Sequence, residues 1–121
     1  MASNTGARYQ KLVSQKITRF GMPLTVIRGT ALVTTSQQTL QGIPQLDKLA
    51  LAALVEEGSL NTANDQPHIF VFPGGSDVQE IIDRVLYLGW KYKVTRAVPM
   101  MVSGIAVSLH CYAIRDGQIS S

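Results

Sequence analysis

Two histidines and one cysteine are the residues best suited to catalysis in this chain of 121 residues. His110 and Cys111 are neighbours within a run in which apolar and polar residues alternate, as in a strand. Adjacent strand residues point to opposite faces of a sheet, so this pair cannot form a nucleophile and its base. His68 is distant in the sequence, and we expect both histidines to be structural. Cys111 is expected to be a small buried hydrophobe, and a lone cysteine permits neither an internal disulfide nor a cysteine metal cluster.

The acidic residues with closest spacing fall into two groups, Glu56 with Glu57, and Asp77 with Glu80 and Asp83. Hydrolysis by paired carboxylates needs two of them across a cleft, and a calcium loop needs oxygen ligands at fixed alternating offsets. Neither spacing is present. We therefore expect these acids to be solvated turn and cap residues.

The segment Pro73-Gly74-Gly75-Ser76 is the one glycine-rich loop, and it follows a strand-like run. It lacks the lysine and the spaced glycines of the nucleotide-binding motifs. A tight turn is the better interpretation. Together these residues predict no catalytic, cofactor or metal site, and we expect that the protein is not an enzyme.

The formal net charge is +3, from eleven basic and eight acidic residues. The bases gather in two places. We treat the first set as a candidate N-terminal interface: Arg8, Lys11, Lys16 and Arg19. We treat the second set as a weaker candidate for facing DNA: Lys91, Lys93 and Arg96. Such a bias favours an anionic neighbour but identifies no nucleic-acid motif. Trp90 and Tyr92 alternate with lysines, which favours core packing of the rings over base stacking.

The elements that must position these residues are mostly strands. Residues 7–20 predict a short amphipathic helix, with Leu12, Val13, Ile17 and Phe20 at helical spacing and a stop at residues 21–23. Extended segments are expected at residues 24–28, 31–35 and 39–43, with a polar loop at 36–38. Further strands are expected at 68–72, 85–88 and 90–96, with a break at Pro99, and the strongest at 105–113.

The fold class predicted is mainly β: a small antiparallel barrel or sandwich with a short N-terminal helix and a long inserted loop. We expect one domain over residues 1–121, with an N-terminal segment at 1–21 and the loop at 41–66. Within the loop, residues 45–57 favour either helix or mobile loop, and a strand is also possible. The polar amino end lacks a signal peptide and no apolar run is long enough for a membrane span, so we expect a soluble protein from a reducing compartment.

The order of segments resembles the head-closure proteins (stopper, or head–tail connector proteins) of tailed bacteriophages. The similarity lies in residues 17–21, with the sequence Ile-Thr-Arg-Phe-Gly, followed by the strand at 22–28. It continues in residues 83–89, the alternating run 90–94, Pro99 and a final strand that ends at Arg115. Residues 45–53 are more apolar than the corresponding loop of those proteins, which keeps tail terminator and tail-completion proteins as alternatives.

This resemblance implies a virion protein at the head–tail junction, assembled in the host cytoplasm without cofactors or a membrane. Its copies would form a hexameric or dodecameric ring below the portal or adaptor protein, close the DNA-filled head and dock the tail terminator or tail tube protein. The long loop would project towards the channel, near the genomic DNA. Its candidate channel-loop or interface residues are Leu46, Leu49, Leu51, Leu54, Glu56 and Glu57.

Two alternatives stay open. A tail terminator would cap the tail tube, and its loss would leave tails of irregular length. A small nucleic-acid-binding module would instead use Lys91, Lys93 and Arg96, with an affinity that falls as salt rises.

Overall fold

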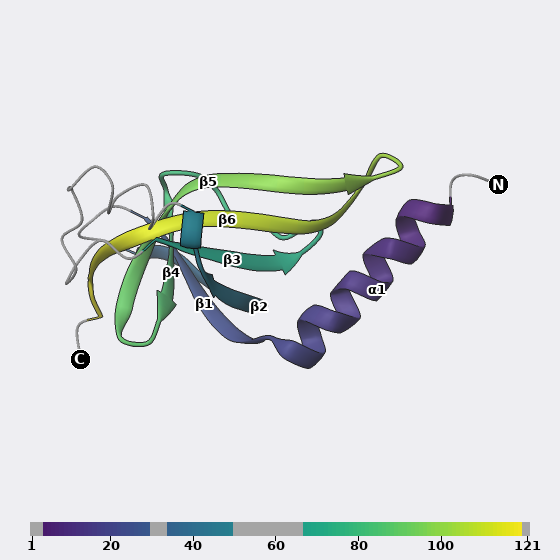
Figure 1. Cartoon of the computed structure of the whole chain (residues 1–121). Helices are drawn as coiled ribbons and strands as arrows, with labels where there is room; N and C mark the ends of the chain where they lie inside the picture. The colour runs from purple at the N-terminus through teal and green to yellow at the C-terminus, as the bar shows by residue number, and fades with distance from the viewer. Residues whose placement is uncertain (1–3, 30–33, 50–66, 120–121) are drawn as a thin grey trace.

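Six antiparallel strands form a closed barrel in a computed structural model that describes residues 4–29, 34–49 and 67–119. The order around the barrel is β1-β2-β3-β6-β5-β4. One helix precedes the barrel, and the termini lie at opposite ends of the molecule (Figure 1). The prediction of a mainly β barrel with a short N-terminal helix is confirmed. The elements are α1 (Asn4–Phe20), β1 (Met22–Gly29), β2 (Thr34–Leu46), β3 (His68–Pro73), β4 (Asp83–Tyr87), β5 (Trp90–Val102) and β6 (Ile105–Gln118).

The hydrophobic core fills the barrel with side chains from alternate strand positions. On β6 the inward residues are Leu109, Cys111 and Ala113, as the alternation predicted. On β5, Tyr92 and Val94 are buried, while Lys91 and Lys93 face outward. The rest of the core comes mainly from Leu24, Val26, Phe70, Phe72, Val78 and Val85.

An aromatic cluster occupies one part of the barrel interior. The rings of His68 and Tyr92 are 4.7 Å apart between centroids in an edge-to-face arrangement, and Phe70 stacks on His68 at 5.9 Å. Tyr87 meets both Phe70 and Tyr92. Such geometry adds stabilisation to simple burial. The prediction that His68 is structural agrees with this packing, and so does the prediction that Tyr92 packs in the core.

The two hairpins that follow β4 and β5 share one turn geometry. Leu88 and Gly89 both have positive φ (49° and 82°), as do Ser103 and Gly104 (50° and 79°). Positive φ at both central residues defines the type I′ turn, whose twist matches that of the flanking strands. Glycine at the second central position lets the backbone adopt this positive φ without steric strain. The β5–β6 hairpin is the long arm that reaches towards the start of α1 (Figure 1).

The strand β2 differs from the prediction, because it runs without interruption through the expected polar loop at 36–38 and beyond Pro44. Ser36 pairs with Arg28 of β1, and Gln38 pairs with Val26. Further along, Pro44 pairs with Phe70 of β3. Pairing partners in the barrel overrode the low strand propensity of glutamine and serine. The predicted loop at 41–66 therefore cannot begin before the end of β2, and residues 50–66 lie outside the described part of the chain.

The break expected at Pro99 is also wrong, since β5 continues to Val102. Ala97 donates its backbone N–H away from β6, to the carboxylate of Glu80. Pro99 lies two residues after Ala97, so the N–H that proline lacks would also point away from β6. There β5 has no strand partner, because β4 pairs only with positions 90–93. A proline is tolerated at such an edge.

Candidate interaction surfaces

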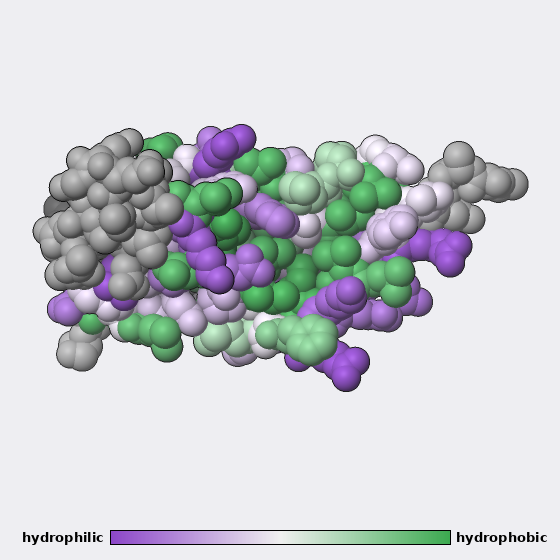
Figure 2. Space-filling model, viewed as in Figure 1, coloured by the Kyte–Doolittle hydropathy of each residue, from purple (hydrophilic) through white to green (hydrophobic). Residues whose placement is uncertain are grey.

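The helix α1 presents four basic side chains to solvent and contains no acidic residue. They are the four predicted for the N-terminal interface: Arg8, Lys11, Lys16 and Arg19. None of them forms an ion pair with another residue that the structure describes. Figure 2 shows hydrophilic residues along the helix and hydrophobic ones between the helix and the strands. The structure therefore brings this predicted set together on one element.

Large apolar side chains on the same helix are also exposed. Tyr9 is 51% exposed, Leu12 54% and Phe20 67%. Of the four apolar residues predicted at helical spacing, Ile17 is 1% exposed and Val13 is half-buried, whereas Leu12 and Phe20 face solvent. Shallow hollows of about 290 and 370 Å³ lie beside Leu12, both lined in part by Arg8. The outer side of α1 consequently offers bases and apolar groups together.

The inner side of α1 is anchored to the barrel, chiefly on β6. The Gln10 side chain donates a hydrogen bond to the Ala106 carbonyl at 2.9 Å. Near the start of the helix, Gly6 sits so close to the end of β5 that a Cβ would collide with the Val102 carbonyl oxygen. Towards the other end of the helix, Ile17 is buried. The helix is held in a fixed place, and its exposed side is therefore a fixed surface.

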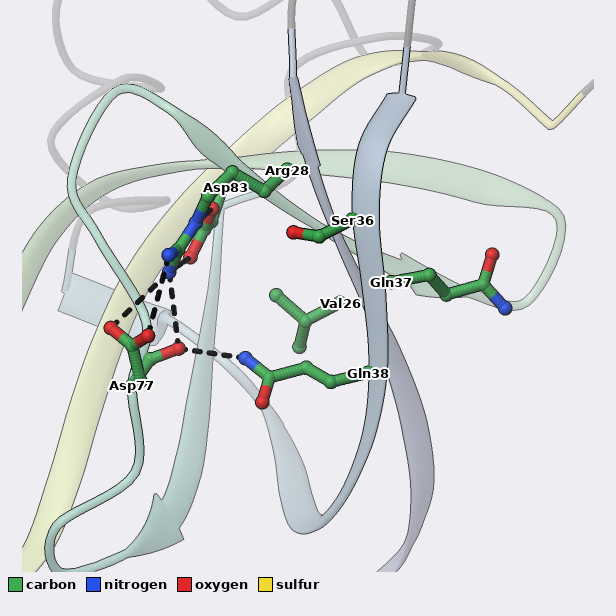
Figure 3. A pocket seen from close by; sticks show the side chains of 7 residues that line it. All are labelled: Val26, Arg28, Ser36, Gln37, Gln38, Asp77 and Asp83. Carbon is green, nitrogen blue, oxygen red and sulfur yellow. Dashed lines mark hydrogen bonds and ion pairs between the residues drawn. The ribbon is translucent and has the colours of Figure 1, made fainter.

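A polar cluster joins β1, β2 and the segment before β4 (Figure 3). Arg28 donates two hydrogen bonds to the carboxylate of Asp83, from Nε at 2.8 Å and from Nη2 at 2.9 Å. It also pairs with Asp77 at 3.2 Å, and Gln38 donates to the Asp77 backbone carbonyl at 2.7 Å. Asp83 accepts a further bond from the Gln79 backbone N–H. The cluster borders a pocket of about 180 Å³.

This cluster has the character of a structural clamp. Asp83 is fully buried, and its hydrogen bonds, with those of Asp77, raise the pKa of Arg28 above its ordinary value. A guanidinium that stays charged transfers no protons, and both carboxylates are already bonded to it. The expectation that Asp83 is a solvated turn residue is wrong, because its carboxylate is buried and binds Arg28, which lies 55 residues away in the sequence. Asp77 and Glu80 are exposed, as expected.

A second basic surface lies on the outer side of β4, β5 and β6. Lys93 is paired in register with Arg84 on one side and with Ile114 on the other. Arg96 is exposed, and its guanidinium lies 5.7 Å from the ring centroid of Tyr112. The predicted bases Lys91, Lys93 and Arg96 are thus joined by Arg84, which the sequence did not point to. Arg84 forms an ion pair with Asp116 at 2.6 Å, also on this side.

The aromatic residues that alternate with the lysines do not share that surface. Tyr92 is buried, and Trp90 packs against the core cluster with the Arg115 guanidinium 4.3 Å from its ring centroid. The Arg115 side chain also donates a hydrogen bond to the Tyr92 hydroxyl at 3.1 Å. Base stacking on Tyr92 is therefore not available from outside, and Trp90 is half-buried with Arg115 against its ring.

The candidate channel-loop residues are described only in part. Leu46 ends β2 and is 42% exposed, and Leu49 is 87% exposed. The other members of the set lie outside the described residues: Leu51, Leu54, Glu56 and Glu57.

The thiol and the imidazole considered for catalysis point apart, as predicted. Cys111 is buried in the core, where desolvation raises its pKa to about 12, with smaller contributions from Asp83 and Glu80. His110 is half-buried on the outer side of β6, and burial lowers its pKa. A thiol with so high a pKa is a poor nucleophile.

Two general features are absent from residues 4–29, 34–49 and 67–119. No group of three or more histidine, cysteine, aspartate or glutamate side chains there has the arrangement of a metal site. No helix in that part combines the length and hydropathy of a transmembrane span. Comparison with family models, with curated proteins and with solved structures finds no match to this chain.

Proposed function

We propose that this protein is a structural subunit of a tailed-bacteriophage neck. Its copies form a ring below the portal or adaptor protein, close the DNA-filled head and provide the docking surface for the tail. The proposal rests on the order of segments that resembles head-closure proteins, together with one observation. The helix α1 is anchored on a closed barrel, yet it exposes large apolar groups and four bases that form no ion pair with the described residues.

Exposed apolar residues elsewhere support self-assembly. Leu46, the last residue of β2, is 42% exposed, and Leu49, three residues further on, is 87% exposed. Each square ångström of apolar surface left in water costs about 25 cal/mol. A neighbouring copy in a ring would cover these side chains through a heterologous contact, in which two different patches meet.

Native mass spectrometry and electron microscopy of the purified protein test this function. The expected result is a ring, either formed alone or formed on a purified portal complex. A chain that stays monomeric and never joins purified capsids would contradict the proposal. Phage particles lacking the protein separate it from a tail terminator, because a head-closure defect yields capsids that lose DNA whereas a terminator defect yields tails of irregular length.

The second basic surface supports one other candidate, a nucleic-acid-binding module. Lys91, Lys93 and Arg96 lie close to Arg84 on one side of the barrel. If that surface binds DNA, replacing the first three with glutamine will weaken binding and flatten its dependence on salt. Absence of DNA binding by the unaltered protein at low salt would eliminate this candidate.

A further inference from the structure

The four bases of α1 lie on the side of the helix that faces away from the barrel. Successive residues of a helix are separated by about 100°, which places Arg8, Leu12 and Arg19 within about 40° of each other. Ile17, the buried anchor, is about 160° from Arg19 by the same count. We call this surface, formed by Arg8, Lys11, Leu12, Lys16 and Arg19, the basic face of α1.

The charge of the whole chain is concentrated on this helix. Of eleven basic residues four are on α1, where there are no acids, so the other seven are outnumbered by the eight acids of the remaining chain. Like charges spaced three or four residues apart destabilise a helix by about 0.2–0.5 kcal/mol per pair. Arg8 with Lys11, and Lys16 with Arg19, have this spacing. An anionic surface placed against α1 would remove that cost.

The apolar members of the face identify the kind of anion. Leu12 is 54% exposed in the middle of the bases, and Tyr9 is 51% exposed at the border. Phosphates offer no apolar contact, so a nucleic-acid backbone would leave Leu12 in water or desolvate it without a partner. Protein interfaces, in contrast, are enriched in tyrosine, phenylalanine and arginine around a desolvated centre.

The exposed acids that the structure describes are poorly suited, in a second copy, to this face. Among the described residues, the exposed carboxylate of Asp77 is paired with Arg28, and that of Asp116 with Arg84. Glu80 accepts the Ala97 backbone N–H. Binding α1 would require these contacts to be exchanged.

We propose that the basic face of α1 docks onto an acidic surface of a different protein, one with a hydrophobic hollow that receives Leu12. This proposal deepens the docking role proposed above and rests on it for its biological setting, but the interaction can be measured without any ring.

Fluorescence anisotropy with the full-length protein tests the proposal. The first probe is a labelled helical peptide of about four turns with glutamates flanking a leucine stripe. The second has the same glutamates with serine in place of leucine, and the third is a short DNA duplex. We expect the glutamate–leucine peptide to bind about tenfold more tightly than the serine peptide, because it covers Leu12. Equal affinity for the two peptides, or tighter binding of the duplex than of the first peptide, would overturn the proposal.

Three variants locate the binding. Arg8→Glu/Arg19→Glu should abolish binding of the first peptide, and Leu12→Ser should reduce its affinity to that of the serine peptide. Lys93→Glu, which changes charge on β5, is the matched control and should bind as the unaltered protein does. Arg8, Leu12 and Arg19 are exposed, and Lys93 is half-buried on the outer side of β5, so each variant should keep the circular dichroism spectrum and melting temperature of the parent.

Sedimentation of the same proteins separates this inference from the ring proposal. Rings that persist in Arg8→Glu/Arg19→Glu, together with lost peptide binding, support a different partner for α1. Rings that dissociate in this variant would show that a second copy occupies the basic face, and would overturn the inference while leaving ring formation intact. Absence of rings in the unaltered protein, both alone and on a purified portal complex, counts against the proposed function alone.

Discussion

Arg28 on β1 and Asp83 at the start of β4 are joined by two near-parallel hydrogen bonds of 2.8 and 2.9 Å. The carboxylate is fully buried, whereas the guanidinium is partly open to solvent. The pair therefore ties β1 to the start of β4. The positive charge of Arg28 makes burial of the Asp83 carboxylate tolerable.

Replacing Arg28 with alanine should destabilise the protein more than replacing Asp77. Without Arg28, the buried carboxylate of Asp83 keeps only the Gln79 N–H as a partner among the bonds described above. Asp77 is 67% exposed, so Asp77→Ala should cost no more than about 1 kcal/mol. Urea denaturation measures both. The double variant Arg28→Leu/Asp83→Leu should recover much of the loss, and equal losses for the two single variants would refute the clamp.

Cys111 should resist thiol reagents in the folded protein. Its thiol is buried in the barrel, and a pKa of about 12 leaves almost no thiolate at neutral pH. Labelling with a chromogenic disulfide should be very slow in buffer and complete within seconds to minutes in denaturant. Rapid labelling of the native protein would mean that β6 does not hold Cys111 inside. A Ser103→Cys variant, on an exposed turn, gives the rate for an accessible thiol.

Acid should destabilise the protein through His110. Burial lowers its pKa in the folded state below the ordinary value of 6.5, so the unfolded chain binds the proton more readily. This group adds no penalty above that value, and stability falls as the pH drops below it. The His110→Gln variant should lose less stability than the parent as the pH falls from 6.5 to about one unit below it. Parallel pH profiles for the two proteins would exclude this role.

Gly6 should be required for the contact between α1 and the β5–β6 hairpin. A Cβ at this position collides with the Val102 carbonyl and lies 3.0 Å from Ile105, so Gly6→Ala should displace the first turn although alanine favours helices. Hydrogen exchange should accelerate there while the barrel stays protected. The neighbouring exposed change Ala7→Gly, which costs about 1 kcal/mol in propensity, is the control. Unchanged exchange in Gly6→Ala would show that the turn tolerates the added methyl group.

The strands were predictable where apolar and polar side chains alternate. They were less predictable where only pairing with a neighbouring strand makes a segment extended. The runs around Tyr92 and Cys111 carry a period of two in the sequence, and both fold as predicted. Ser36 and Gln38 carry no such signal and become strand because β1 lies beside them. Pro99 misled the prediction because sequence alone does not tell an edge from a centre.

The interaction surfaces show the same division. Arg8 and Arg19 could be assigned to one helix from spacing, since helical geometry is local. The pairing of Arg28 with Asp83, and the approach of Arg84 to Lys93, depend on barrel closure over long stretches of chain. Whether Leu12 faces the barrel or solvent could not be predicted, because a weak apolar pattern fits more than one face of a helix.

The ring of six strands also determines how the molecule would carry tension. Because α1 leads into β1 and β6 is the last strand in the sequence order of the described residues, a pull applied between the start of β1 and the end of β6 must travel from β1 to β6. These strands lie opposite each other in the barrel, with three hydrogen-bonded ladders between them in either direction. Stretching force therefore divides between two routes with equal numbers of ladders, and no single seam bears it alone.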